Sequence, residues 1–260
     1  LEPHGDITKI DAKSIPDHDV LFAGFPCQPF SIIGNRLGFD DIRGTLFFEI
    51  TRILKEKKPR FFILENVKQI SRHNKGKTIQ VILSSLEEVG YKVHWSVLNA
   101  LDFGLPQKRE RTLIVGFLNH DVAFSFPAPV GPGMLEDVLE DDANVDKRFF
   151  ASQKIIDKRL AKHKSEYSPG IWHENKSGNI TSYPYSCALR AGASYNYLLV
   201  NGKRRLTPRE MLRLQGFPDD KFQIVCNDSQ TRKQAGNAVP VNVIKAVLEE
   251  ALNAEAKAEG

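Results

Sequence analysis

The chain has 260 residues, of which 41% are hydrophobic and 26% charged, a balance typical of a globular protein with one large domain or a large and a small one. No apolar run approaches the ~20 residues that cross a bilayer, and three cysteines without metal-ligand spacing argue against a disulfide framework and a metal site. The net charge of +4 permits a polyanionic partner without requiring one, and the cysteine usage fits a reducing cytoplasm.

The first half of the chain alternates between strand-like and helix-like segments. Short apolar runs predict buried strands at 19–24, 60–66, 91–98 and 112–117. Helices are expected over about 45–57 and 77–89, where apolar residues recur at helical spacing. Pro59 and Gly90 follow these two segments and are typical helix stops. The alternation predicts an α/β protein with a mostly parallel, doubly wound sheet.

A Pro/Gly cluster at 126–133 interrupts this alternation and predicts a domain boundary. The sequence beyond it has an acidic and a lysine-rich stretch and then reads as short strands and loops. We therefore expect a first domain, a smaller and mostly β domain, a hinge with one helix, and a C-terminal helix that returns to the first domain, over 1–130, 131–203, 204–235 and 236–260.

Helical order returns near residue 204. Thr207, Pro208 and Glu210 have the spacing of a capping box, with Thr207 at the N-cap position and Glu210 at N3. The stretch 234–240 is interpreted as a turn that leads into a last helix extending to about Lys257.

Cys27 follows directly after the first predicted strand, which Pro26 ends. Most free cysteines are buried core residues, but ligands of open α/β sheets bind beyond the carboxyl ends of the strands, where this thiol is expected. Glu65 lies at the end of the next strand, and Arg109 and Arg111 precede another. We interpret this nucleophile, carboxylate and arginine pair as a catalytic constellation.

Five motifs occur in a fixed order: Gly24-Phe-Pro-Cys-Gln-Pro-Phe-Ser31, Glu65-Asn-Val67, Gln107-Lys-Arg-Glu-Arg111, Arg205-Leu-Thr-Pro-Arg-Glu210 through Gln215-Gly-Phe-Pro218, and Gly236-Asn-Ala-Val-Pro240. Their order and spacing resemble those of the cytosine-C5 DNA methyltransferases, and residues 5–120 resemble the HhaI-type enzymes in particular. The resemblance covers nearly the whole chain except about 130–195. It implies a Rossmann-like methyltransferase sheet, a target-recognition domain at 131–203, S-adenosylmethionine as methyl donor, and double-stranded DNA as substrate, in the cytoplasm of a bacterium with a restriction-modification system.

The resemblance also implies a role for each catalytic residue. As a thiolate, Cys27 would attack carbon 6 of a flipped-out cytosine and so make carbon 5 nucleophilic. Glu65 would hold or protonate ring nitrogen 3. Arg109 and Arg111 would bond the O2 of the base and support the thiolate or Glu65. The loop at 28–44 would close over the DNA as a lid.

Cofactor and DNA contacts are implied in the same way. Contacts with S-adenosylmethionine are expected from Asp6, Ile7, Pro26, Leu46, Asn237 and Ala238. DNA contacts are expected from Ser31, Arg43, Arg209 and Arg213; for the last two, a solvated helix face is an alternative interpretation.

The family's glycine-rich cofactor turn, and the acidic residue after its second strand, do not occur in this sequence. We therefore expect the N-terminal strands to be missing, and a second polypeptide or a longer form of the chain to supply them. These 260 residues alone are expected not to bind S-adenosylmethionine tightly. Two alternatives stay open: a tRNA cytosine-C5 methyltransferase, and a non-catalytic, complementing DNA-binding subunit of a split methyltransferase.

Overall fold

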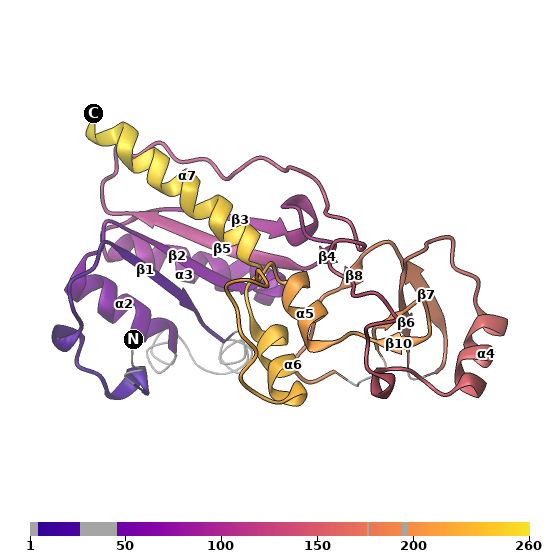
Figure 1. Ribbon diagram of the computed structural model, residues 1–260. Helices are drawn as coiled ribbons and strands as arrows, with labels where there is room; N and C mark the ends of the chain where they lie inside the picture. The colour runs from indigo at the N-terminus through magenta and orange to yellow at the C-terminus, as the bar shows by residue number, and fades with distance from the viewer. Residues whose placement is uncertain (1–4, 27–45, 176, 194–196) are drawn as a thin grey trace. The chain divides into compact units, whose positions relative to one another are not determined.

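The computed structural model describes residues 5–26, 46–175, 177–193 and 197–260 (Figure 1). The chain forms two compact units. Unit 1 comprises Leu1–Leu98, Glu110–Pro127 and Val247–Gly260, and unit 2 comprises Asn99–Arg109 and Ala128–Ala246. In the described ranges, none of the helices is long and apolar enough to span a membrane. Short 3-10 helices occur at Ile7–Lys9 (η1), Ala12–Ser14 (η2), Lys68–Ser71 (η4), His73–Gly76 (η5), Ala100–Asp102 (η6) and Lys147–Phe149 (η7).

Unit 1 is built on a four-stranded sheet with the order β1-β2-β5-β3. Its strands are β1 (Val20–Gly24), β2 (Phe61–Val67), β3 (Lys92–Asn99) and β5 (Glu110–Phe117). β1 and β2 are parallel, but β2 and β5 are antiparallel, which differs from the mostly parallel sheet that the sequence predicts. The connection from β3 to β5 contains no α-helix. A strand can follow in the parallel direction only after a crossover connection of a dozen or more residues, so β5 runs antiparallel.

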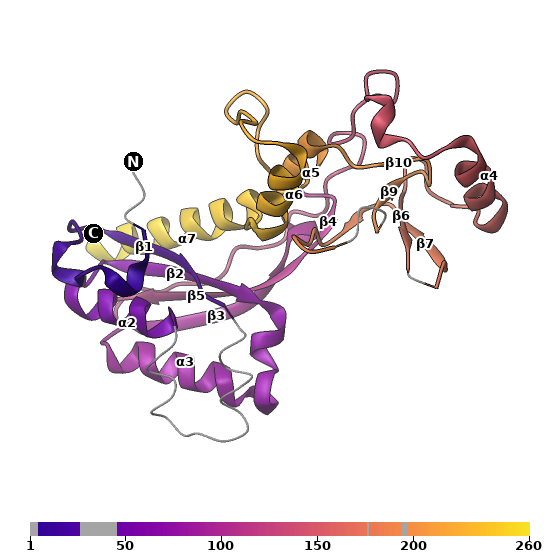
Figure 2. The ribbon, with the colours of Figure 1, turned by 90° about the horizontal axis from the view of Figure 1, so that it is seen from below.

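Helices cover both faces of this sheet, α2 (Leu46–Lys57) and α3 (Lys77–Glu88) on one side and the C-terminal part of α7 (Val241–Glu259) on the other (Figure 2). The apolar faces predicted for α2 and α3 are buried: Phe47 and Leu54 pack in one core cluster with Phe62 of β2. On the other side, Arg60 Nε donates to Glu255 Oε2 of α7 over 2.9 Å. Both faces of the sheet are therefore covered by helices.

Unit 2 contains a four-stranded sheet of the order β10-β9-β6-β7, in which all three pairs of neighbouring strands are antiparallel. The strands are short, as the sequence predicts for this region: β6 (Ile171–Glu174), β7 (Ile180–Tyr183), β9 (Leu199–Val200) and β10 (Arg204–Arg205). A second, two-stranded sheet pairs β4 (Gln107–Lys108) with β8 (Ser186–Cys187) in parallel. The helix α4 (Gln153–Lys162) precedes β6 in the chain.

The helix α5 (Pro208–Leu214) begins with the predicted capping box. Glu210 N donates to Thr207 Oγ1 at 3.1 Å and Thr207 N donates to Glu210 Oε2 at 2.8 Å, so the prediction is confirmed. The stretch 234–240, by contrast, is not simply a turn, because its first residues are the end of α6 (Asp228–Asn237). Residues 228–234 are all polar, so no apolar periodicity indicates this helix, although Asn227 is a typical N-cap residue and does cap it.

Candidate active site

A carboxylate and an arginine meet at the end of the unit 1 sheet. Glu65 lies on β2 opposite Leu113 of β5, and Arg111 lies two residues before Leu113, hence on the same face. Arg111 Nε is 2.7 Å from Glu65 Oε1, and each side chain is only 15% exposed. The strand register thus holds the pair in one geometry.

The two charged groups of this pair have little contact with solvent. Burial lowers the pKa of the Arg111 guanidinium, while the charge and the hydrogen bond of Glu65 act in the opposite direction. Arg111 Nη1 also donates to the carbonyl of Glu110 at 2.8 Å, which fixes the plane of the guanidinium. Arginine remains protonated in proteins even so, and the result is an oriented, partly desolvated ion pair.

The chain that leads to Cys27 lies beside this pair. Gly24 is paired with Glu65 in the parallel register of β1 and β2, and a Cβ at position 24 would be 3.5 Å from Glu65 Oε2. Asn66 Nδ2 donates to the carbonyl of Phe25 at 2.8 Å. The backbone just before Pro26 is therefore tied to the end of β2. Three predicted site residues, Cys27, Ser31 and Arg43, lie outside the described residues.

Arg109 has a different environment from Arg111, although only one residue separates them. Arg109 is 2% exposed and belongs to unit 2. Its Nη1 donates to the carbonyl of Leu189 at 2.7 Å, and its Nη2 donates to the carbonyls of Gly236 and Ala238 at 3.0 and 2.7 Å. These contacts with backbone oxygens were not anticipated from the sequence, which grouped the two arginines.

Arg109 is part of a buried polar network in unit 2. Gln107 donates from Nε2 to the carbonyl of Leu214 at 2.7 Å and accepts from the amide of Leu189 at 3.0 Å. Gln215 Nε2 donates to the carbonyl of Ala235 at 2.6 Å, and both glutamines are fully buried. We call Gln107, Arg109 and Gln215 the carbonyl network. It joins three of the sequence motifs through backbone groups that no sequence pattern could indicate.

Close backbone contact accompanies the carbonyl network. Gly236, near the end of α6, packs so tightly that a Cβ there would lie 2.3 Å from the amide nitrogen of Ala191. Only glycine permits this approach. Asn237 and Ala238, both predicted cofactor contacts, follow directly and sit at the end of α6.

The other predicted cofactor contacts that the structure describes belong to unit 1. Asp6 caps η1, where its Oδ1 accepts from the amide and hydroxyl of Thr8 at 3.1 and 2.8 Å. Ile7 lines an apolar cavity of about 310 Å³ together with Ile10, Ile15, Leu21 and Ile53. Leu46 begins α2 and is 41% exposed. Asp6 and Leu46 are not among the residues that line this cavity.

Two predicted DNA contacts, Arg209 and Arg213 on α5, are engaged within unit 2. Arg213 Nη2 is 2.5 Å from Asp219 Oδ2, and Arg209 Nη1 donates to the carbonyl of Phe222 at 2.9 Å. The hydrogen bond from Arg213 lowers the pKa of Asp219, and the same bond raises the pKa of Arg213. A phosphate would have to compete with Asp219 for these guanidinium groups.

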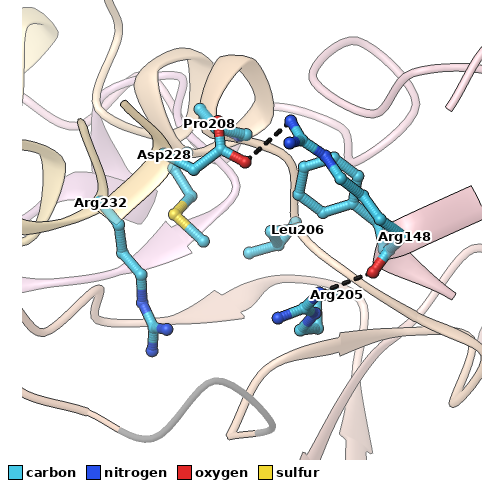
Figure 3. A pocket seen from close by; sticks show the side chains of 8 residues that line it. Arg148, Arg205, Leu206, Pro208, Asp228 and Arg232 are labelled. Atoms are coloured by element: carbon cyan, nitrogen blue, oxygen red, sulfur yellow. Dashed lines mark hydrogen bonds and ion pairs between the residues drawn. The ribbon is translucent and has the colours of Figure 1, made fainter. Parts of the chain in front are cut away.

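Unit 2 also contains a small cationic pocket that no sequence motif predicted (Figure 3). The guanidinium groups of Arg148 and Arg205 lie 5.0 and 5.7 Å from the ring centre of Phe149. Arg148 Nη2 is 2.9 Å from Asp228 Oδ2, and Arg232 also lines the cavity, whose volume is about 50 Å³. These residues come from separate segments, which is why no single motif predicts the pocket. Among the described residues, no cluster of His, Cys, Asp or Glu is suited to a metal ion.

Comparison with known proteins gives consistent results. The family model described as C-5 cytosine-specific DNA methylase matches residues 2–253. The Type II methyltransferase M.NgoBI of Neisseria gonorrhoeae is 58% identical over 94% of this chain and 77% of its own length. The Type II methyltransferase M.HhaI of Haemophilus parahaemolyticus is 40% identical over 94% of this chain and 79% of its own length.

A solved structure, the Entamoeba histolytica methyltransferase EhMeth, superposes with a TM-score of 0.68 over 97% of this chain and 82% of its own length. The two sequences are 18% identical, so this likeness concerns the fold alone. It confirms the Rossmann-like α/β methyltransferase fold.

Proposed function

Because the chain belongs to the C-5 cytosine-specific DNA methylase family and is a DNA methyltransferase of the restriction-modification type, we propose that it methylates carbon 5 of a flipped-out cytosine within a specific duplex sequence. The observation that carries the proposal is the Glu65–Arg111 ion pair beside the strand end that leads to Cys27. We place the reaction in the bacterial cytoplasm, where the DNA is found.

The proposed reaction begins with Cys27. Its thiolate adds to carbon 6 of the extruded base, and the electrons of the C5–C6 double bond become available at carbon 5. Carbon 5 would then form a bond to the methyl group that S-adenosylmethionine supplies, while the bond from that methyl group to the sulfonium sulfur breaks and S-adenosylhomocysteine is left. When a base then removes the proton from carbon 5, the double bond forms again and the thiolate leaves as the C6–S bond breaks.

Glu65 is proposed to hold ring nitrogen 3 while Cys27 adds. The ring becomes more electron-rich during this addition, and a group that bonds or protonates nitrogen 3 stabilises it. The Arg111 bond at 2.7 Å keeps the Glu65 carboxyl in one orientation, so little reorganisation is needed when the base arrives. Arg111 is also the proposed partner of the base O2.

Arg109 is proposed to act as a positioning residue. Its bonds to the carbonyls of Gly236 and Ala238 hold the end of α6, where the proposed cofactor contacts Asn237 and Ala238 lie. Loss of Arg109 is therefore expected to weaken cofactor binding more than the chemical step. A purely structural residue would affect the KM for S-adenosylmethionine and that for DNA equally.

A second polypeptide is proposed to complete the cofactor site. The support is the position of β1, which stands at the edge of the described sheet, with Phe22 46% exposed. Such an edge presents backbone groups that another strand can pair with. The sequence also has no glycine-rich turn of the family's type. Calorimetry should then show that this chain alone does not bind S-adenosylmethionine with micromolar affinity.

The direct test is methyl transfer from labelled S-adenosylmethionine to duplex DNA and, in parallel, to tRNA. A duplex with 5-fluorocytosine at the target should become covalently trapped on Cys27, because fluorine stands in place of the carbon-5 proton that must leave before the C6–S bond can break. Cys187→Ala and Cys226→Ala are matched controls that should still be trapped. Methylation of tRNA only would replace the DNA assignment, and no trapping with all segments present would favour a non-catalytic subunit.

A further inference from the structure

A cationic segment follows directly after Glu65. Residues 66–86 contain no Asp or Glu but include Lys68, Arg72, Lys75 and Lys77. Lys68 Nζ forms an ion pair with Glu110 Oε1 at 2.5 Å, whereas the side chains of the other three are exposed. We call residues 68–77 the basic turn. It lies in unit 1, where it leaves the strand end that carries Glu65.

Arg72 differs from the other arginines in the described part of the chain. Their guanidinium groups bind carboxylates, backbone carbonyls or an aromatic ring, as in the pairs of Arg52 with Glu49 and Arg159 with Glu174. The side chain of Arg72 makes no such contact, and those of Lys75 and Lys77 make none either. These three exposed cations lie on a segment without acidic residues and have no anionic partner within the described chain, so they are available to an external anion.

The backbone of the basic turn is held in a defined conformation. Asn74, Lys75 and Gly76 have positive φ values of 49°, 56° and 83° in succession. His73 Nδ1 lies 2.6 Å from the hydroxyl of Thr78, and Ile70 is fully buried in the core of unit 1. The three cations are therefore presented from an anchored support rather than from a free tail.

We propose that Arg72, Lys75 and Lys77 bind backbone phosphates of the DNA duplex from which the cytosine is flipped toward Glu65. The inference rests on the proposed function, because it needs duplex DNA at this end of the sheet. Phosphate contacts fix the register of a protein on the duplex without reading its sequence. Contacts from the unit that carries Glu65 would hold the DNA backbone while the base is extruded.

The test compares two triple variants that remove the same charge. Arg72→Gln, Lys75→Gln and Lys77→Gln together change the basic turn. The control variant combines Lys55→Gln, Lys58→Gln and Lys257→Gln. These lysines are exposed and unpaired in unit 1, and they lie in α2, just before β2, and near the end of α7. Each protein is measured together with whatever second polypeptide DNA methylation requires. The readout is the Kd for a specific duplex at several salt concentrations.

Each lost phosphate contact lowers the slope of log K against log salt by about 0.9. Between 50 and 200 mM salt the wild type should therefore lose about 40-fold more affinity than the basic-turn variant, if all three contacts are made. The control variant should keep the wild-type slope. At saturating DNA the basic-turn variant should retain the wild-type kcat, because Glu65 and Arg111 are untouched. Arg72→Gln alone should lower the slope by about 0.9 and guards against misfolding of the triple variant.

The outcomes separate the two proposals. If the wild type methylates DNA and the basic-turn variant keeps its salt slope, this inference is wrong and the proposed function stands. If both triple variants lose the same slope, the effect is one of net charge and the inference is also wrong. A wild type that neither binds nor methylates duplex DNA would overturn the proposed function itself.

Discussion

Arg109 and Arg111 belong to one motif, yet they lie in regions of opposite character. Arg111 is in unit 1, where it meets a carboxylate in a pair that is 15% exposed. Arg109 is in unit 2, almost fully buried, and donates to three backbone carbonyls. The partner decides what each arginine does. A carboxylate at a strand end is available to a substrate, whereas buried carbonyls serve to join segments of the chain.

The energetics of the two regions differ accordingly. Hydrogen bonds from a charged donor contribute about 1.5–3 kcal/mol each, and loss of Arg109 would leave buried carbonyls without a donor. At the Glu65–Arg111 pair, solvent reaches both groups to some extent, and the geometry matters more than the strength of the attraction. Substitutions in the carbonyl network should therefore change stability, and substitutions in the pair should change the reaction rate.

Glu65→Gln should have the largest effect and tests the catalytic side of this comparison. Glutamine keeps the shape but cannot carry the charge or donate a proton as the acid does, so kcat should fall by about 10³-fold. Single-turnover methyl transfer at saturating DNA measures this. The free energy of unfolding should change much less than in an Arg109 variant. A Glu65→Gln enzyme that reacts at the wild-type rate would remove Glu65 from the mechanism.

Arg109→Met tests the structural side. Methionine fills similar space without donors, so the carbonyls of Leu189, Gly236 and Ala238 lose their hydrogen bonds from Arg109. The free energy of unfolding should therefore fall by about 3 kcal/mol. Urea denaturation measures the loss. Activity per folded molecule should keep its kcat, with a raised KM for S-adenosylmethionine. A large fall in kcat with unchanged stability would place Arg109 with Arg111 in the chemistry.

Arg111→Lys sharpens the comparison by retaining the charge. Lysine lacks the planar fork that bonds Glu65 and is proposed to reach the base O2, so kcat should fall by about 10²-fold. The salt dependence of DNA binding should not change, because no phosphate contact is lost. Equal kcat values for the wild type and this variant would mean that charge alone suffices at position 111.

Gly236→Ala probes the packing around the carbonyl network. The new Cβ would lie 2.3 Å from the amide nitrogen of Ala191, so the backbone must move. The free energy of unfolding should therefore fall by about 2 kcal/mol. Gly192→Ala is the matched control, because a Cβ there has no atom within 4 Å. Equal unfolding free energies for the two variants would show that α6 is not tightly packed at this point.

The smallest effect is expected at Asp219, the partner of Arg213. Because the folded-state pKa of Asp219 is lowered, its contribution to stability is present above the unfolded-state pKa and is lost as the pH falls through the folded value. The side chain is 48% exposed, so screening limits the contribution to about 0.5 kcal/mol. Asp219→Asn should cost this amount at pH 7 and nothing at pH 2, as measured by urea denaturation. A pH-independent difference would exclude the ionic origin.

The amino-acid sequence by itself determined the local elements and the family. The strands β1, β2 and β5, the helices α2 and α3, and the capping box of α5 all follow from short-range periodicity and turn chemistry, which neighbouring residues decide. The ordered motifs were enough to identify the methylase family, which the match over residues 2–253 confirms.

Only the tertiary structure decided the direction of β5, the existence of α6 and the separate environments of Arg109 and Arg111. The carbonyls that Arg109 binds lie far along the chain, at Leu189, Gly236 and Ala238, and a backbone oxygen has no sequence signature. The Glu65–Arg111 pair likewise depends on strand register. Contacts between distant segments are fixed by packing, so a motif specifies which residues matter but not which partners they find.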